Sequence, residues 1–414
     1  MPRHRSVTGS TAAGRFAFAL LWLFVWSFPV EKTIEIPGVG YVSKALGMLA
    51  LGAGFLAVAI DGRIRPLTRA HAVLLLFVLW TALTVRWSLD PSATVAKAGT
   101  CLQLLGFGWL VWEFCTEERY VIRLMQAYVF GTLYAGANAL LRYQLAHQTY
   151  YQRYAADGFD PNDFALTLAL SIPLSYSLAI RAKGVKSCVY WAQLGLTLLS
   201  VLLSASRTGF LASCVAASVI PLTFAYTRRQ HKLLIVTGAM AAALCLAAVV
   251  PASSWQRLAT IGSEVRSGSL NDRGSIWHAG FQVFQQHWFA GVGSGAYPRA
   301  VEPVLGWPSG WLIVAHNTFL SVLVETGIVG FLLFAIFLAL LVKAIYGMQG
   351  LSRIVWAVTL LVWFAGVNTL TWEIRKPTWF IFGLILTQAR FGQPAGAMPA
   401  RHIPAMSEWV GAEA

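Results

Sequence analysis

Long apolar stretches separated by short polar segments dominate this chain. A helix needs about 20 apolar residues to cross a bilayer, and about twelve stretches reach or nearly reach that length. The pattern therefore predicts an all-α integral membrane protein with about twelve transmembrane helices. We expect the spans at about 16–30, 40–60, 70–85, 92–114, 120–145, 161–181, 187–204, 208–226, 233–252, 317–342, 354–370 and 378–390.

Composition agrees with this pattern. Hydrophobic residues make up 57% of the chain and charged residues only 12%, whereas about 25% of an average soluble protein is charged. An even number of spans places both termini on the same side of the membrane. We expect a single polytopic membrane domain over residues 1–390 and a short tail over residues 391–414.

Basic residues indicate the orientation. Cytoplasmic loops are enriched in Lys and Arg, and one alternating set of loops holds most of the 31 basic residues, among them Arg65, Arg69, Arg181 and Arg229. We therefore place both termini and the short tail in the cytoplasm. The net charge of +14 is mostly this topology signal. The sequence has no basic domain of the kind that binds nucleic acid, so we expect no nucleic-acid partner.

Three polar segments open to the opposite, outer side of the membrane in this topology. Residues 142–163 join the fifth and sixth spans, and residues 204–209 join the seventh and eighth. Residues 253–315 form one long outer loop between the ninth and tenth spans. Any chemistry performed by polar side chains is therefore expected on the outer face.

The long outer loop contains an amphipathic pattern. Trp277, Phe281, Phe284 and Trp288 recur at the spacing i, i+4, i+7 and i+11, which brings side chains onto one face of a helix. The pattern predicts a helix that lies at the membrane interface.

Polar residues and glycines bound this predicted helix. Asn271 or Asp272 precedes it and is suited to cap its first turn. Gly291, Gly293 and Gly295 follow it and are expected to end it. We interpret these glycines as a turn and not as a phosphate-binding loop, because no strand precedes them.

His316 and Asn317 open the otherwise apolar tenth span. At about 100° per residue, Gly327 and Gly330 would lie on the same helical face as His316. Glycines let a neighbouring helix approach closely, so the imidazole would rest against packed protein. This position suits a general base; a hydrogen-bonded structural histidine is the alternative. Glu325 would point away from His316 and is not expected to orient it.

Four further polar residues on the outer side have both a structural and a functional interpretation. Arg207 lies between two apolar stretches and either extends to lipid headgroups or binds a substrate. Arg273 is either an ordinary loop charge or a ligand for an anion. Asp160 and Asp163 are compatible with a metal, but a helix cap by Asp160, with Pro161 in the first turn, is favoured.

Glu373 and Lys376 precede the last predicted span at the spacing i, i+3. Such a pair forms a local ion pair when both residues lie on one helix face. The alternative is that the two side chains bind an anionic or sugar group, and the sequence leaves both interpretations open.

The order of these elements resembles that of the O-antigen ligases and O-antigen polymerases of Gram-negative bacteria. The ligase signature is His, then Asn, Ser or Gln, nine residues, Gly, two residues, and Gly, Thr or Tyr. The matching residues are His316, Asn317, Gly327 and Gly330, and the segments DPNDFAL at 160–166, SASRTG at 204–209 and Arg273 to Gly295 look like the family's other marks.

The resemblance implies a multi-pass protein of the bacterial inner membrane with its active site on the periplasmic face. It implies transfer of O-antigen glycan from undecaprenyl pyrophosphate to a lipid A-core hydroxyl, among membrane lipids. His316 would act as the general base, and Arg207 and Arg273 would bind the pyrophosphate. One direct displacement would invert the anomeric carbon. We expect no cofactor and no metal, because the arginines neutralise the leaving group.

Five further residues are predicted to support the site, and three other functions are alternatives to the ligase. The candidates for supporting the site or contacting substrate are Asn317, Asp160, Asp163, Glu373 and Lys376. The alternative functions are an O-antigen polymerase, a protein O-oligosaccharyltransferase and, less favoured, a transporter. A transporter predicts polar residues buried at mid-membrane, whereas the candidate catalytic residues map to one face. The single long outer loop favours the ligase.

Overall fold

The structure is a computed structural model, and it describes residues 11–38, 40–62, 64–145, 153–227, 229–263, 273–307 and 313–391. Within these ranges the chain is almost entirely helical, with one antiparallel pair of strands, β1 (Glu35–Ile36) and β2 (Gly40–Tyr41). The predicted tail after Phe391 and the predicted caps Asn271 and Asp272 lie outside the described residues.

The predicted spans are helices. In the described part of the chain, eight helical segments are long and apolar enough to cross a membrane. They are α3 (Val42–Asp61), α4 (Arg69–Leu83) with η2 (Thr84–Arg86), α5 (Pro91–Phe114), α7 (Pro161–Arg181), α8 (Val185–Leu203), α9 (Arg207–Ala217) with α10 (Val219–Thr223) and η3 (Phe224–Tyr226), α16 (Thr318–Tyr346) and α17 (Gly350–Val367).

Four more helices occupy the remaining predicted spans, so the prediction of an all-α multi-pass membrane protein is confirmed. They are α2 (Ala12–Trp26), α6 (Glu118–Leu145), α11 (Arg229–Val249) and α18 (Lys376–Gln388). The end of the first predicted span is η1 (Phe28–Val30), and three helices fall in the predicted long outer loop or at its start, namely α12 (Ala252–Ala259), α14 (Arg273–Gln286) and α15 (Tyr297–Leu305).

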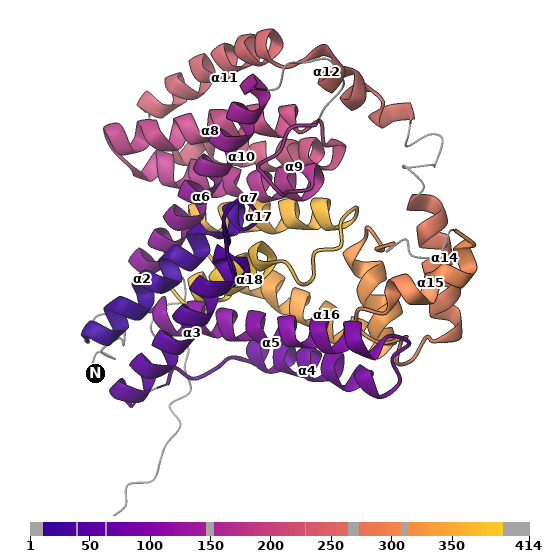
Figure 1. Cartoon of the computed structure of the whole chain (residues 1–414). Helices are drawn as coiled ribbons and strands as arrows, with labels where there is room; N and C mark the ends of the chain where they lie inside the picture. Colours follow the sequence, from indigo (N-terminus) through magenta and orange to yellow (C-terminus); the bar gives the residue numbers. More distant parts are fainter. Residues whose placement is uncertain are drawn as a thin grey trace, which may run out of the picture.

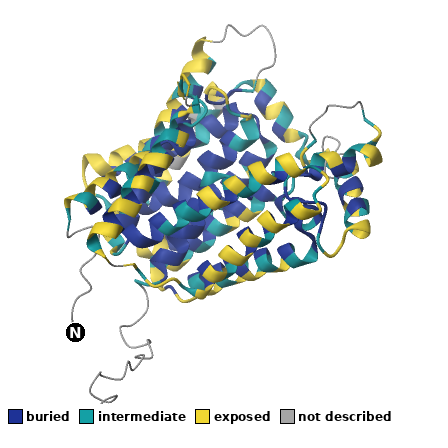
Figure 2. Ribbon diagram, turned by 60° about the horizontal axis from the view of Figure 1, so that its bottom comes forward, coloured by how far each residue is buried: buried dark blue, intermediate teal, exposed yellow. Residues whose placement is uncertain are grey.

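Helix α7 lies in the interior of the bundle and is almost completely buried (Figures 1 and 2). Its sequence is apolar on all sides, as expected for a helix that neighbours surround. Glycines on two neighbours allow the close packing. A Cβ on Gly209 of α9 would lie 2.2 Å from the Cβ of Ala165, and one on Gly366 of α17 would lie 2.3 Å from Leu166. The second turn of α7 is thereby fixed against α9 and α17.

Helices α14 and α15 pack together beside the first half of α16 (Figure 1). A small separate core holds them, formed by residues such as Ile276 and Val283 of α14, Tyr297 of α15 and Val324 of α16. The predicted amphipathic helix is therefore present. Its aromatic face is partly open, since Phe281 is 50% exposed, as expected for a helix that contacts a lipid interface.

Helix α16 is interrupted at Gly327, where φ is 64° and ψ is −170°, a conformation that glycine adopts readily. His316 precedes the helix and has a φ of 46°, and the helix begins only at Thr318. The prediction that His316 lies on one smooth helical face with Gly327 and Gly330 is therefore wrong. A helical extrapolation fails because the backbone departs from the helix at both ends of that interval.

The loop after α14, residues 287–295, fills the interruption in α16. Gly293 N donates to the carbonyl of Glu325 at 3.0 Å, and Ile328 N donates to a carbonyl of the loop at 2.8 Å. A Cβ on Gly327 would lie 2.2 Å from a backbone oxygen of the loop. The close approach that the glycines predict is thus present, although the neighbour is a loop and not a helix. The predicted turn at 291–295 is confirmed, because all three of its glycines have positive φ.

Candidate functional site

Two of the predicted motifs lie side by side at the starts of α7 and α9. Asn162 Oδ1 accepts hydrogen bonds from Ser206 Oγ at 2.9 Å and from Arg153 Nη2 at 2.7 Å. Arg153 Nε also donates to the carbonyl of Ser204 at 3.1 Å. The segments 160–166 and 204–209, which are distant in sequence, are therefore in direct contact.

Asp160 has the structural role that was favoured. Its Oδ1 accepts hydrogen bonds from the backbone N–H groups of Asn162 at 2.8 Å and Asp163 at 3.2 Å, and Pro161 occupies the first turn of α7. This is an ordinary N-cap. The carboxylate nevertheless leaves a negative charge near two other candidate residues, Arg273 and His316, whose pKa values it raises.

Asp163 connects α7 to the segment before α18. Its Oδ1 accepts from Trp372 Nε1 at 2.8 Å, and its Oδ2 accepts from Arg375 Nη2 at 2.7 Å. Both oxygens therefore have protein donors. The nearby Thr318, at the start of α16, donates to the carbonyl of Leu370 and accepts from Trp372 N, each at 2.8 Å.

Arg207 is the first residue of α9, and Ser206 caps that helix by accepting from Gly209 N at 3.1 Å. The Arg207 guanidinium is half-buried and donates to the carbonyl of Arg257 at 3.2 Å and to Thr260 Oγ1. These contacts hold Arg207 between the helix bundle and the start of the long loop, instead of leaving it extended alone toward lipid.

Arg273 is the first residue of α14 and is half-buried. Burial lowers the pKa of its guanidinium, Asp160 raises it, and Arg207 lowers it again. These electrostatic influences require the start of α14 to lie near the starts of α7 and α9. Two arginines that are distant in sequence therefore share one region.

His316 completes this group. Its ring is half-buried, and the structure gives it no hydrogen bond to another described residue. Burial lowers the pKa of His316, Arg273 lowers it further, and Asp160 and Asp163 act in the opposite direction. We call these five residues, Asp160, Asp163, Arg207, Arg273 and His316, the site cluster.

The residues on either side of His316 fix its position. The carbonyl of Ala315 accepts from Trp277 Nε1 of α14 at 2.9 Å. Asn317 is the N-cap of α16 and accepts from Leu320 N at 3.0 Å. Asn317 is therefore a supporting residue whose amide oxygen is already used by the helix.

Of the two interpretations of Glu373 and Lys376, the local ion pair is wrong. Glu373 Oε1 accepts from Lys97 at 2.6 Å and from Ser321 Oγ at 2.9 Å, whereas Lys376 pairs with Glu31. The i, i+3 spacing brings side chains together only within a helix, and α18 begins at Lys376 itself. Glu373 lies before that start.

A buried charge cluster of Lys97, Glu325 and Glu373 was not found by sequence reasoning. Lys97 Nζ lies 2.6 Å from Glu325 Oε2 and 2.6 Å from Glu373 Oε1, and each of the three side chains is at most 11% exposed. Gly295 N also donates to Glu325 Oε2 at 2.7 Å. The signal was a charged residue inside each of two predicted spans, since such residues are costly in lipid and need partners.

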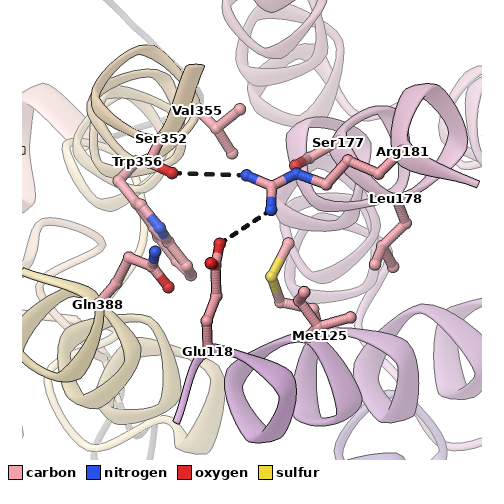
Figure 3. Close-up of a pocket in the computed structure, with 10 residues that line it drawn as sticks. Glu118, Met125, Ser177, Leu178, Arg181, Ser352, Val355, Trp356 and Gln388 are labelled. Carbon is pink, nitrogen blue, oxygen red and sulfur yellow. Dashed lines mark hydrogen bonds and ion pairs between the residues drawn. The ribbon is translucent and has the colours of Figure 1, made fainter. Parts of the chain in front are cut away.

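A small pocket at the other end of the bundle is separate from the site cluster (Figure 3). Arg181 closes it by pairing with Glu118 at 2.9 Å and donating to Ser352 Oγ at 3.4 Å. Arg181 ends α7, whereas the site cluster lies at the start of the same helix. The 21 residues of α7 separate the two by about 30 Å.

Comparison with known proteins agrees with the signature residues. Residues 192–335 match the O-antigen ligase family, and no curated protein matches the chain. The matched region includes Arg207, Arg273 and His316, while Asp160 and Asp163 precede it. The match over residues 192–335 is consistent with the O-antigen ligase and polymerase superfamily, so the resemblance seen in the sequence is confirmed.

Proposed function

We propose that this protein is an O-antigen ligase, which transfers O-antigen glycan from undecaprenyl pyrophosphate to a hydroxyl of lipid A-core. The observation that carries the proposal is that Arg273 lies within electrostatic reach of both Arg207 and His316, and these three residues begin or precede three different helices inside the matched region. Glycosyl transfer to a hydroxyl needs a base for the acceptor proton and positive charge for the leaving phosphates. The site cluster contains both.

His316 is the general base. A base must be unprotonated before it acts, and burial together with the positive charge of Arg273 lowers the pKa of this imidazole and keeps it neutral near pH 7. The neutral ring takes the proton from the acceptor hydroxyl as the oxygen attacks the anomeric carbon. A positioned base contributes about 10²–10⁴-fold in rate.

Arg207 and Arg273 bind the pyrophosphate. Cleavage of the sugar–phosphate bond leaves negative charge on the phosphate oxygens, and guanidinium groups bind such oxygens through paired N–H donors. Arg207 and Arg273 are also first residues of helices, so nearby backbone N–H groups add to the positive potential. We propose that this charge takes the place of a metal and that a single displacement inverts the anomeric carbon.

The reaction occurs at the periplasmic face of the bacterial inner membrane. This orientation rests on the excess of basic residues in the opposite set of loops. Helices α14 and α15 border the site cluster, and the exposed Phe281, Trp288 and Phe289 provide an aromatic face for lipid. Such a border suits an acceptor whose own acyl chains stay in the leaflet, which favours lipid A-core.

Reconstitution tests the transfer reaction directly. Purified protein is mixed with undecaprenyl pyrophosphate-linked glycan and lipid A-core, and the product is a lipopolysaccharide band of reduced mobility. The His316→Ala variant serves as the matched negative control. Absence of transfer by a folded wild-type protein would refute the proposed reaction.

Gene deletion separates the ligase from the polymerase, which shares the donor and differs in the acceptor. In a strain with smooth lipopolysaccharide, loss of a ligase leaves core without O-antigen while undecaprenyl-linked polymer accumulates. Core that carries a single O-unit would instead identify the protein as a polymerase.

A further inference from the structure

Arg375 lies beside the site cluster but is not explained by the proposed reaction as described above. It is the residue before α18 and pairs with Asp163 at 2.7 Å. Its side chain is 39% exposed, whereas that of Asp163 is 14% exposed. The cation of this pair therefore faces open space, and the anion faces the protein.

The Arg375 guanidinium has more N–H donors than its hydrogen bond to Asp163 uses. A guanidinium carries five N–H donors, and the only side-chain hydrogen bond that Arg375 makes to a described residue uses Nη2. Asp163 does not depend on Arg375 alone, because its other oxygen accepts from the buried Trp372. A purely structural ion pair would be expected to use the arginine more completely.

The segment that carries Arg375 is fixed next to His316. Thr318 begins α16 two residues after His316, and it bonds the backbone of Leu370 and Trp372 at 2.8 Å each. Asp163, the partner of Arg375, also acts on the pKa of His316. Arg375 and the candidate base therefore share one neighbour and one stretch of packed backbone.

We propose that Arg375 is a third arginine that binds the pyrophosphate group of the donor, and that Asp163 holds it in place until the donor arrives. This inference rests on the proposed function. The pyrophosphate oxygens accept hydrogen bonds from the N–H groups of Arg375 that face open space. They also compete with Asp163 for the hydrogen bond that Arg375 Nη2 donates. Arg207, Arg273 and Arg375 together supply three positive charges to a diphosphate.

The two partners of the Asp163–Arg375 pair should then have opposite effects. Arg375→Gln removes a charge-assisted hydrogen bond to the donor, so we expect the Michaelis constant for the lipid-linked donor to rise about tenfold with a smaller change in kcat. Asp163→Asn frees Arg375, so we expect the Michaelis constant to fall. If the pair were only structural, both substitutions would break the same contact and would lower stability and activity alike.

A double variant removes the general effect of charge. Loss of the Asp163 carboxylate makes the whole site more attractive to anions, but only an effect that acts through Arg375 disappears when Arg375 is absent. We expect the gain from Asp163→Asn to vanish in the Arg375→Gln background. A gain that persists in the double variant overturns the proposal.

Two matched controls test alternative explanations. Arg299→Gln removes an exposed arginine of α15 that pairs with Glu302, and we expect an unchanged Michaelis constant. Trp372→Phe removes the other partner of Asp163 without changing charge. If this variant mimics Arg375→Gln in donor affinity at equal thermal stability, Arg375 acts only by holding Asp163.

Binding of inorganic pyrophosphate separates this inference from the proposed reaction. Isothermal titration of the folded, full-length protein with pyrophosphate needs no transfer activity. We expect Arg375→Gln to weaken this binding about tenfold and Arg299→Gln to leave it unchanged. If wild type and Arg375→Gln bind pyrophosphate with equal affinity, the proposed role of Arg375 is rejected even where transfer is observed. If Arg375→Gln weakens pyrophosphate binding but no transfer is observed, only the proposed reaction is rejected.

Discussion

The protein contains two groups of charged residues that differ in how their charges are satisfied. In the buried charge cluster, Lys97 contacts both Glu325 and Glu373 at 2.6 Å, and a backbone and a hydroxyl donor add to these contacts, while Glu373 Oε2 has no hydrogen-bond partner among the described residues. In the site cluster, Arg273 and His316 are half-buried and Arg273 lowers the pKa of His316, yet neither side chain has a hydrogen bond to another described residue. Charges that already have partners hold helices together, whereas charges gathered without them are available to a substrate.

The largest expected effect is on the site cluster. We expect His316→Ala to lower the rate of transfer about 10²–10⁴-fold, because a positioned base is lost. Stability and abundance should stay near wild type, since the ring makes no hydrogen bond to a described residue. Transfer in the reconstituted system and the thermal unfolding temperature check this prediction. A variant that keeps more than about a tenth of the wild-type rate contradicts the assignment of the base.

The matching change in the buried charge cluster should act on stability. Lys97→Met leaves two buried carboxylates without their cation, and breaking a buried ion pair in this way costs about 3–5 kcal/mol. We expect a much lower amount of folded protein in the membrane and a lower unfolding temperature. A Lys97→Met variant that is as stable as wild type but inactive would show that this cluster belongs to the chemistry.

Conservative changes at the two arginines should have an intermediate effect. Arg207→Lys and Arg273→Lys keep the charge but lose the paired donors of the guanidinium. We expect transfer to fall by about tenfold or more, which is the loss of one charge-assisted hydrogen bond. Measuring the transfer rate at saturating and at low donor concentration checks this fall in activity. Full activity of either variant would identify that position as an ordinary surface charge.

The dependence of transfer on pH tests the link between His316 and Arg273. The base acts in its neutral form, so the rate should fall as the pH drops through a pKa below the ordinary value of 6.5. Arg273→Gln removes a positive charge that lowers this pKa. The acidic limb of its profile should therefore move to higher pH, while Arg299→Gln should leave it in place. If the acidic limb of the Arg273→Gln profile stays at the wild-type pH, Arg273 does not influence the pKa of His316.

The smallest expected effect is that of a chelator. Both oxygens of Asp163 accept hydrogen bonds, from Trp372 and Arg375, and one oxygen of Asp160 caps α7. We expect EDTA to leave transfer unchanged. Loss of activity that Mg²⁺ or Mn²⁺ restores would make these carboxylates candidates for metal ligands.

Local signals in the sequence were sufficient for the spans and for the helix starts. Asp160 and Asn317 cap the helices that they precede, and each acts within three residues of its own position. The length of each apolar stretch predicted a helix without any knowledge of its neighbours. The extrapolation from His316 to Gly330 failed, because a positive φ at Gly327 and at His316 interrupts the helical spacing.

The sequence by itself determined the helices, eight of which are long and apolar enough in the described residues to cross a membrane, the amphipathic α14 and the residues from which the site cluster is built. Only the tertiary structure decided the partners of the charges. Lys97 lies 228 residues from Glu325 and 276 residues from Glu373 in the sequence. Lys376 forms its ion pair with the distant Glu31 and not with the neighbouring Glu373. Burial of apolar surface is not directional, so apolar stretches predict that helices pack without predicting which ones meet. The positions of the charged side chains follow from that packing.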